Sequence, residues 1–306
     1  MSAPTAAVAV CAYTPDRWDV LGAAVDAALA QLGRGDELVL VVDHHPALLE
    51  RARRRWPSVR VIANAGPPGL SGGRNTAVAA TSADVVVFLD DDAVPRPGWL
   101  AALRRRFADP ATTVVGGAVV ARWEGGRAPR WFPPEFGWAV GCDYRGLPGD
   151  GAAIRNPIGA NMAIRRTALD LAGPFSTELG RVGALPAGCE ETEIGIRIAR
   201  AVPDGRIVRD TGAAVDHLVP AARQRVGYLV RRCFHEGRSK AALTRSVGGA
   251  AALASERGYV LRVLAGGAAR HLAAVLRGDL AGPARAALVV TGLAVTAAGY
   301  VGGLTR

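Results

Sequence analysis

Apolar and polar segments alternate along the first 121 residues in a repeated order of strand and helix. Continuous apolar runs of the kind found in strands buried on both faces lie at residues 6–13, 37–43, 59–62, 85–89 and 113–121. Apolar positions at helical spacing lie between or after them, at residues 20–32, 48–56, 76–81 and 99–107. This alternation predicts an α/β fold with a doubly wound, mostly parallel sheet that is flanked by helices and joined by right-handed crossovers.

The second part of the chain departs from this alternation. Residues 122–156 are irregular and rich in glycine, proline and tryptophan, and long loops of this kind are usually functional or mobile. Short strand-like pieces follow at residues 207–208 and 214–215, and residues 228–240 predict a basic helix with one apolar face. From residue 241 onward the chain is rich in alanine and glycine, which predicts a helical C-terminal region.

The chain of 306 residues carries a formal net charge of +10, which raises the question of a nucleic-acid partner. Lys240 is the only lysine, so the excess is almost entirely arginine and fits a coding bias toward GC-rich codons. The sequence has no zinc-finger spacing and no RNA-binding signature of interleaved basic and aromatic residues. We therefore expect no nucleic-acid partner. The basic excess after Arg197 could equally meet anionic lipid or substrate phosphates.

Cysteine usage and the chain ends bear on location. The four cysteines are scattered without a CxxC pair, so a reducing cytosol is the simplest location, and the N-terminus lacks the pattern of a secretory signal. Residues 286–304 are uncharged and approach the length of a membrane span, although alanine and glycine make them only weakly hydrophobic. This favours a buried or interfacial helix over a true span. We expect a cytoplasmic protein with peripheral contact to the inner face of the cell membrane.

Three consecutive carboxylates, Asp90, Asp91 and Asp92, follow the apolar run at residues 85–89. Adjacent like charges repel one another, and each is costly to bury without a partner. A divalent cation would relieve that cost, and hard oxygen ligands suit Mg²⁺ or Mn²⁺. Ligands of open α/β sheets bind beyond the carboxyl ends of the strands, where this cluster is expected. The cluster predicts a metal and phosphate site; the alternative is an acidic turn that caps the next helix.

Two further features are expected at the same edge of the sheet. Asp43 ends the second apolar run and could accept hydrogen bonds from a base or a ribose, although a lone aspartate there is more typical of a turn. A glycine-rich loop at residues 66–75 contains Arg74, whose guanidinium would face phosphate or a carbonyl-bearing base. The loop has neither the GxGxxG nor the Walker pattern. The prediction of a nucleotide site therefore rests on the expected position of Asp43, the loop and the acidic cluster at the same edge of the sheet.

Acidic residues recur before a helical pattern near Ile194. Glu190 and Glu191 either cap the N-terminus of this helix or supply a general base that deprotonates a hydroxyl. His217 follows a strand-like piece, and a lone histidine is more often structural than a metal ligand. On the residues alone, both alternatives stay open for each position.

The order of these features over residues 6–240 resembles the inverting family 2 glycosyltransferases with the GT-A fold. The matching elements are the first strand with Thr14, the strand ending in Asp43, Gly-Gly-Arg-Asn at 72–75, Phe-Leu-Asp-Asp-Asp at 88–92, Gly-Ala-Asn-Met at 159–162, and Glu190-Glu191. The helix at residues 228–240 resembles the subgroup with lipid-linked or membrane-proximal acceptors. The resemblance implies a transferase domain at residues 1–240, with a nucleotide-binding half (1–121) and an acceptor and catalytic half (122–240), followed by an extension at 241–306.

The resemblance also implies a role for each matched residue. The residues expected to bind the nucleotide sugar are Thr14, Asp43, Arg74, Asp90 and Asp91, with Asp90 on the ribose. Asp92 of the DxD motif and His217 would bind the Mg²⁺ or Mn²⁺ that bridges the diphosphate. Glu191 matches the catalytic base, and Glu190 is the alternative because the family usually has an aspartate at the second position. Glu190 and Asn161 are expected on the acceptor side.

The implied activity is a metal-dependent transfer of a hexose from a nucleoside diphosphate sugar, and UDP-sugars are the commonest donors in the family. The acceptor would be the hydroxyl of a glycan, a lipid-linked molecule or a small molecule. In a single in-line displacement, the base takes the acceptor proton while the metal-bound diphosphate leaves. Two other classes stay open: a nucleotidyltransferase that makes a nucleotide sugar, and a non-catalytic basic membrane-binding module.

Overall fold

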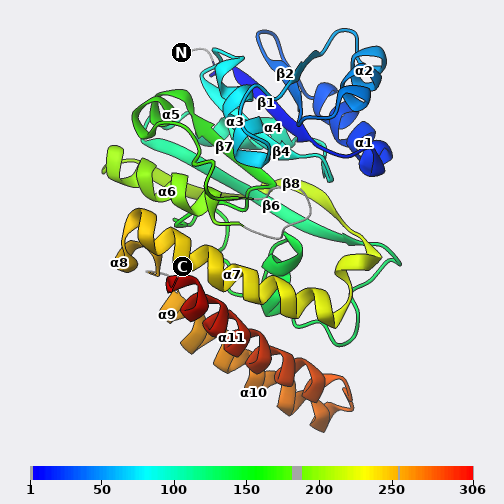
Figure 1. Cartoon of the computed structure of the whole chain (residues 1–306), viewed down its shortest axis with the longest axis vertical. Coiled ribbons are helices and arrows are strands. Elements are labelled where there is room, and N and C mark those ends of the chain that lie inside the picture. Colours follow the sequence, from blue (N-terminus) through cyan, green and yellow to red (C-terminus); the bar gives the residue numbers. More distant parts are fainter. Residues whose placement is uncertain (1–2, 181–187, 254–255, 306) are drawn as a thin grey trace. The chain divides into compact units, whose positions relative to one another are not determined.

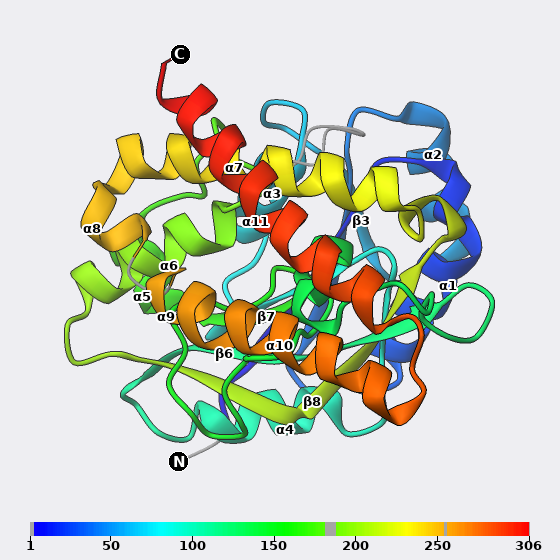
Figure 2. The same cartoon turned by 90° about the horizontal axis from the view of Figure 1, so that it is seen from below.

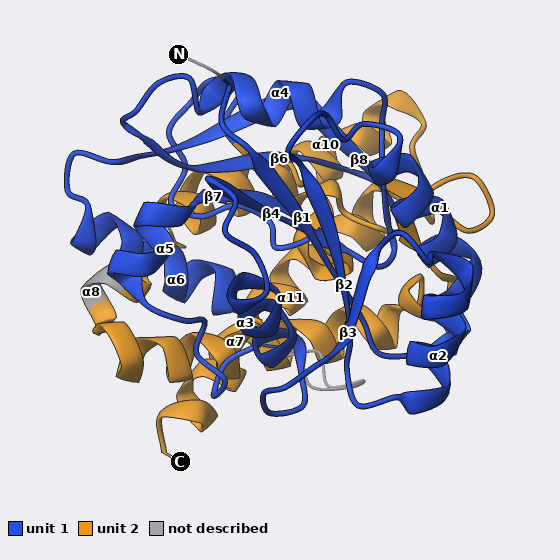
Figure 3. Cartoon of the chain, turned by 90° about the horizontal axis from the view of Figure 1, so that it is seen from above, with its two compact units in different colours: residues 1–120, 148–185, 190–217 blue, residues 121–147, 186–189, 218–306 orange. Residues whose placement is uncertain are grey.

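The computed structural model describes residues 3–180, 188–253 and 256–305, which belong to two compact units. Unit 1 comprises residues 1–120, 148–185 and 190–217, and unit 2 comprises residues 121–147, 186–189 and 218–306 (Figure 3). Each unit is therefore assembled from segments that are separated along the chain. The residues expected to carry the chemistry all fall in unit 1.

Unit 1 is organised around an eight-stranded sheet with the order β3-β2-β1-β4-β7-β6-β8-β5 (Figure 1). The strands are β1 (Ala6–Ala12), β2 (Glu37–Val42), β3 (Arg60–Ala63), β4 (Val85–Asp90), β5 (Ala93–Pro95), β6 (Thr112–Trp123), β7 (Asn161–Arg165) and β8 (Arg206–Val219). The four strands β3, β2, β1 and β4 pair in parallel, whereas β7 is antiparallel to both β4 and β6, and β5 is antiparallel to β8. The two strand-like pieces expected near residue 210 are one continuous strand, β8.

Helices connect and cover these strands. They are η1 (Pro15–Arg17), α1 (Trp18–Leu29), α2 (Pro46–Arg55), α3 (Leu70–Ala79), α4 (Trp99–Arg106), α5 (Arg166–Ala172) and α6 (Glu190–Ala201). Helix α1, which follows β1, packs against β5, the last strand in the sheet order, so the sheet is curled. Helix α3 begins at Leu70, six residues before the start expected from the sequence, so Gly72 and Gly73 lie in its first turn and not in a loop. A Cβ at Gly72 would lie 2.0 Å from the carbonyl oxygen of Pro67, so only glycine permits this close approach.

The apolar core of unit 1 fixes the strand that carries the acidic cluster. Phe88 of β4 and Met162 of β7 are almost fully buried, and the ring of Phe88 meets Phe175 edge to face at a centroid distance of 5.2 Å. Ile194 and Ile198 of α6 join the same cluster through one face of the helix. Complete burial of such side chains stabilises the fold by about 1.5–3 kcal/mol each. The start of α6 and the end of β4 are thus anchored in one core.

Unit 2 is mainly helical. Its elements are η2 (Pro134–Val140), η3 (Ala221–Arg223), α7 (Val226–Val247), α8 (Gly249–Ala252), α9 (Glu256–Gly258), η4 (Tyr259–Leu264), α10 (Ala265–Ala273), η5 (Ala274–Arg277) and α11 (Gly282–Leu304). Helices α7 and α11 lie side by side (Figures 1 and 2). A Cβ at Gly237 would lie 2.0 Å from Thr296 O, and one at Gly299 would lie 2.1 Å from Phe234 O. Glycine therefore sets the close approach of the two helices.

Two helical stretches of unit 2, Tyr259–Arg277 and Gly282–Leu304, are long and apolar enough to cross a membrane by length and composition. The second contains the uncharged segment at residues 286–304 that was identified from the sequence. The first was not expected, because the arginines within it interrupt the apolar run.

Candidate active site

The three consecutive carboxylates lie at the carboxyl end of β4. The strand ends at Asp90, and Asp91 and Asp92 lead into β5. Asp91 and Asp92 are each 3% exposed, whereas 28% of the Asp90 side chain is exposed. Antiparallel pairing of Ala93 with His217 brings the histidine of β8 to this cluster, with its Nε2 3.1 Å from Asp92 Oδ1. Strands that are distant in sequence therefore build one polar cluster.

The donor atoms of this cluster fit a divalent cation. One ligand atom each from Asp90, Asp92 and His217 lies within 4.8 Å of the other two. Asp91 Oδ2 is buried and accepts no hydrogen bond within the described part of the chain. Two carboxylates and an imidazole suit ions such as Mn²⁺, and an unsatisfied buried oxygen is costly unless a cation or water meets it. Asp90 thereby joins the two ligands expected from the sequence.

Arg17 is a cation of this site that sequence reasoning missed. It ends the turn η1 after β1, and its Nη1 lies 2.5 Å from Asp91 Oδ1 and 3.1 Å from Asp92 Oδ2. Burial raises the pKa of Asp91 to about 7; Arg17 opposes this shift and Asp92 adds to it. The position of Arg17 just beyond the end of a parallel strand is the sequence signal that could have found it.

A pocket with an empty volume of about 490 Å³ adjoins the cluster. It is lined by Cys11, Ala12, Tyr13, Arg17, Asp43, Gly69, Leu70, Gly73, Asp90 and Asp91. These residues come from the ends of β1, β2 and β4 and the start of α3, so the pocket lies at the carboxyl edge of the parallel strands. Thr14 lies between two lining residues, and its hydroxyl accepts a hydrogen bond from the Asp16 amide (3.2 Å) that caps η1.

Asp43 lines the pocket and also orders the segment before α3. Its Oδ1 accepts a hydrogen bond from Asn64 Nδ2 (2.6 Å), and its Oδ2 accepts one from the Gly69 amide (2.9 Å). Partners from two other segments therefore orient the carboxylate, while 15% of the side chain remains exposed. The two interpretations of Asp43, as a pocket residue and as a turn partner, apply to the same side chain.

Arg74 is almost fully buried and connects two acidic elements. Its Nη1 lies 3.1 Å from Glu190 Oε1, and its Nη2 lies 3.6 Å from Asp90 Oδ1 and donates to the carbonyl of Gly159 (3.0 Å). The Arg74 side chain is 2% exposed, so its guanidinium interacts with these protein groups and hardly with solvent. One guanidinium thus links the acidic end of β4 to the first residue of α6.

The two glutamates at the start of α6 have different environments. Glu190 is 5% exposed, with one oxygen on Arg74 and with its Oε2 buried and without a hydrogen-bond partner in the described structure. Glu191 is half-buried. The helix N-terminus favours both negative charges, so capping and chemistry are compatible here. Glu191 is the more accessible of the pair.

Asn161 forms a structural junction and is not among the pocket-lining residues. It is fully buried at the start of β7. Its Nδ2 donates to the carbonyls of Ala118 (2.9 Å) and Ala213 (2.8 Å), and its Oδ1 accepts from Trp99 Nε1 (2.8 Å). These bonds tie β6, β7, β8 and α4 together, and a contact between Asn161 and an acceptor stays a prediction.

Comparisons with known proteins place this geometry in context. The chain matches the sequence profile of Glycosyl transferase family 2 over residues 7–171. It is 32% identical over 237 residues to the glucosyl-dolichyl phosphate glucuronosyltransferase of Haloferax volcanii, which covers 76% of this chain and 75% of the relative.

Two solved structures resemble the fold. The mannosyltransferase PcManGT from Pyrobaculum calidifontis, in complex with GDP-Man and Mn²⁺, matches with a TM-score of 0.63 at 18% identity, over 96% of this chain and 87% of that one. The glucosyl-3-phosphoglycerate synthase from Mycobacterium tuberculosis, in complex with Mn²⁺, UDP and phosphoglyceric acid, matches with a TM-score of 0.51 at 19% identity, over 80% of this chain and 79% of that one. Both likenesses confirm the α/β fold expected from the sequence.

Proposed function

This chain belongs to glycosyl transferase family 2 and has the GT-A fold, and we propose that it transfers a sugar from a nucleoside diphosphate sugar to an acceptor hydroxyl with inversion at the anomeric carbon. The observation that carries this proposal is the bridge from Asp90 through Arg74 to Glu190. It brings the acidic cluster, which would receive the diphosphate, and the carboxylates of α6, which would receive the acceptor proton, into one site.

The donor half of the proposed site consists of the pocket and the acidic cluster. Asp90, Asp92 and His217 would hold Mg²⁺ or Mn²⁺, and the bound ion would neutralise the charge that builds on the departing diphosphate. Asp43 would accept hydrogen bonds from the ribose or base, and Arg17 would donate to the diphosphate. The similar structures with GDP-Man or UDP together with Mn²⁺ support this assignment, and UDP-sugars are the first donors to test.

The general base of the proposed reaction is Glu191. A base must reach the acceptor hydroxyl, and Glu191 is the more exposed of the two glutamates, whereas Glu190 is held by Arg74. Glu190 and Arg74 would then fix the first turn of α6. The Glu191 carboxylate takes the proton as the acceptor oxygen attacks the anomeric carbon and the bond to the diphosphate breaks.

The acceptor we propose is a lipid-linked sugar or phosphate at the cytoplasmic face of the membrane. The similar protein of Haloferax volcanii is a glucosyl-dolichyl phosphate glucuronosyltransferase. In unit 2, Leu272, Leu276 and Leu280 follow one another at four-residue intervals and are 56%, 90% and 79% exposed. Exposed leucines near the basic Arg277 suit the interface of an anionic bilayer. Sedimentation with anionic liposomes should fall sharply for Leu276→Glu combined with Leu280→Glu.

A transfer assay tests the proposed reaction. The purified chain is incubated with a panel of UDP- and GDP-sugars, Mn²⁺ and polyprenyl-phosphate-linked acceptors, and release of the nucleoside diphosphate is measured. We expect release with one donor and its loss with chelator. Release of pyrophosphate from a nucleoside triphosphate and a sugar phosphate would instead identify a nucleotidyltransferase.

A pair of isosteric variants tests the base. Glu191→Gln should lower the turnover number by about 10²- to 10⁴-fold while donor affinity changes little, because general-base catalysis contributes a factor of that size. Glu190→Gln is the matched variant, and it should have the smaller effect on turnover. The assignment is wrong if Glu191→Gln turns over normally, and it passes to Glu190 if the order of the two effects is reversed.

A further inference from the structure

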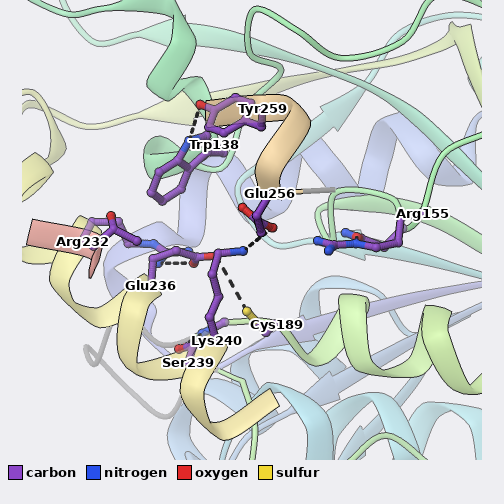
Figure 4. A network of polar contacts seen from close by, with 12 residues as sticks. Trp138, Arg155, Cys189, Arg232, Glu236, Ser239, Lys240, Glu256 and Tyr259 are labelled. Carbon is purple, nitrogen blue, oxygen red and sulfur yellow. Dashed lines mark hydrogen bonds and ion pairs between the residues drawn. The ribbon is translucent and has the colours of Figure 1, made fainter. Parts of the chain in front are cut away.

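A row of buried charges follows one edge of helix α7 in unit 2 (Figure 4). Arg232, Glu236 and Lys240 are spaced four residues apart, with side chains 11%, 13% and 14% exposed. Arg232 Nη1 lies 2.8 Å from Glu236 Oε2, and Lys240 Nζ lies 3.2 Å from Glu236 Oε1 and 2.8 Å from Glu256 Oε1. Three charged side chains are thus largely shielded from solvent, together with Glu256, which is 25% exposed, and this is costly unless the geometry is specific.

The lysine of this row is unusual for the chain. Lys240 is the only lysine in a sequence whose other strong cations are arginine. An ammonium is a compact charge with three donors, whereas a guanidinium is a planar fork that needs more room. Lys240 meets two carboxylates from different elements, which is an arrangement that suits the compact group. A coding bias toward arginine has therefore not replaced lysine at this one position.

Two side chains of helix α7 also accept hydrogen bonds from the two residues that lead into α6. The amide of Gly188 donates to Ser239 Oγ (3.2 Å), and Cys189 Sγ donates to Glu236 Oε1 (3.7 Å). All four residues belong to unit 2. The next residue in the chain is Glu190, the first residue of α6. Helix α7 therefore holds the segment directly before the carboxylate pair.

The backbone of this segment needs such support. Cys189 has a φ of +75°, in the left-handed region that residues other than glycine adopt only at a cost. A Cβ at Gly188 would lie 3.3 Å from Arg232 Nη2, so the segment runs close against α7. A conformation of this kind persists only where its surroundings impose it. Ser239 and Glu236 supply that constraint through the two hydrogen bonds.

We propose that Ser239 and Glu236 of α7 are positioning residues for the catalytic base, because they fix Gly188 and Cys189, the two residues that lead directly into Glu190 and Glu191. This inference rests on the proposed glycosyl transfer. Its consequence is that a change in α7 lowers turnover without weakening donor binding. A misplacement of about 1 Å at a reacting group can cost roughly 100-fold in rate.

The test compares two hydroxyl deletions on the same helix. Ser239→Ala removes the acceptor of the Gly188 amide, and Ser239→Thr restores a hydroxyl. Thr244→Val is the matched control, because Thr244 Oγ1 donates to Lys240 O (2.9 Å) within the helix and meets Tyr300 rather than the segment before α6. Glu236→Gln is the second variant, which changes the partner of Cys189.

Two readouts are measured for each variant. The first is the rate of Cys189 alkylation by iodoacetamide, resolved by mass spectrometry, with buried Cys233 as the internal control for loss of folding. The second is turnover and the donor KM with the sugar nucleotide found in the transfer assay. For Ser239→Ala we expect faster labelling of Cys189 but not of Cys233, turnover lower by roughly 10- to 100-fold, and an unchanged KM. Ser239→Thr should recover both, and Thr244→Val should change neither.

The outcomes separate this inference from the proposed function. If the wild-type chain transfers no sugar from any sugar nucleotide, the proposed function is wrong, and the positioning role is wrong with it. If the wild-type chain is active, the positioning role alone is overturned by a Ser239→Ala variant with normal turnover. It is likewise overturned if Cys189 is labelled no faster in Ser239→Ala and in Glu236→Gln than in the wild-type chain.

Discussion

The acidic cluster of unit 1 and the Glu135 network of unit 2 bury carboxylates in opposite ways. In the cluster, Asp91 Oδ2 has no hydrogen-bond partner in the described structure, although Asp91 is 3% exposed and lines the pocket. In the network, Glu135 is fully buried, its Oε1 lies 3.0 Å from Arg270 Nη2, and its Oε2 lies 2.9 Å from His271 Nε2. Arg285 completes the network by donating to His271 Nδ1 (3.1 Å).

The difference separates carboxylates that hold a fold from carboxylates that are available to a ligand. A buried carboxylate with a partner on each oxygen has its desolvation offset within the protein. The cluster has no such offset at Asp91 Oδ2, and the neighbouring set of Asp90, Asp92 and His217 suits a divalent cation. Two sites with similar burial therefore predict opposite responses to substitution: loss of binding in one, and loss of stability in the other.

The largest expected effect tests the ligand side of this contrast. Asp92→Asn keeps the shape of the side chain and removes the charge that we assign to the metal. We expect kcat/KM to fall by about 10³-fold, because metal charge stabilisation is worth several kcal/mol and each 1.36 kcal/mol is a factor of ten. Mn²⁺ titration by calorimetry should show that metal binding is lost. Asp26→Asn, at an exposed ion pair with Arg55, is the control, and unchanged Mn²⁺ affinity in Asp92→Asn would remove Asp92 from the metal site.

The second effect tests the structural side. Glu135→Gln leaves the buried His271 and the half-exposed Arg270 without the carboxylate, and removal of one partner of the buried Glu135–His271 pair costs about 3 kcal/mol. We expect the free energy of unfolding in urea to fall by that amount, while donor affinity is retained under conditions where the variant is folded. Glu50→Gln, at an exposed pair with Arg53, should change the free energy by less than about 0.5 kcal/mol. Equal effects of the two variants would contradict the contrast.

The third prediction concerns the effect of pH on stability through the ionisation of Glu236. Burial raises the pKa of Glu236, but Lys240 and Arg232 outweigh it and lower the pKa to about 2. Because the pKa is lower in the folded chain than in the unfolded one, near 4.3, the stability that this carboxylate contributes is present above pH 4.3 and is lost as the pH falls toward 2. The loss at pH 3 should be about 2 kcal/mol. Glu236→Gln should flatten the pH dependence of urea unfolding in this window, and an unchanged slope would contradict the assignment.

Much of the fold could be predicted because its signals are local. The apolar runs of β1, β2 and β4 are long enough to identify buried strands from the sequence alone. Strand β8 was divided in two because its middle is polar, and tertiary partners explain that polarity. Asp210 is fully buried there, with its carboxylate 2.6 Å from Arg106 Nε of α4. The local sequence around residue 210 gives no indication of an ion pair between Asp210 and Arg106.

The candidate site was predictable to the extent that its residues follow strands. Asp43 and the residues of the acidic cluster were found because they end apolar runs at one edge of the sheet. Arg17 was missed because its partner Asp91 lies 74 residues away. The contact of Asn161 with an acceptor stays a prediction; its amide bonds to Trp99 and to carbonyls of β6 and β8, which only the sheet pairing brings together.

Arg17 gives the smallest and the sharpest test, because it is the one cation of the described structure that both pairs with the acidic cluster and lines the pocket. If it serves the ligand, Arg17→Gln should weaken donor binding about tenfold, which is the lower end of the roughly 1.5–3 kcal/mol that a hydrogen bond to a charged group contributes. Arg17→Lys should retain part of that affinity, since it keeps the charge but not the fork. Calorimetric titration with the donor at two salt concentrations measures both variants. A stability loss with unchanged donor affinity would move Arg17 to the structural class, alongside Arg270.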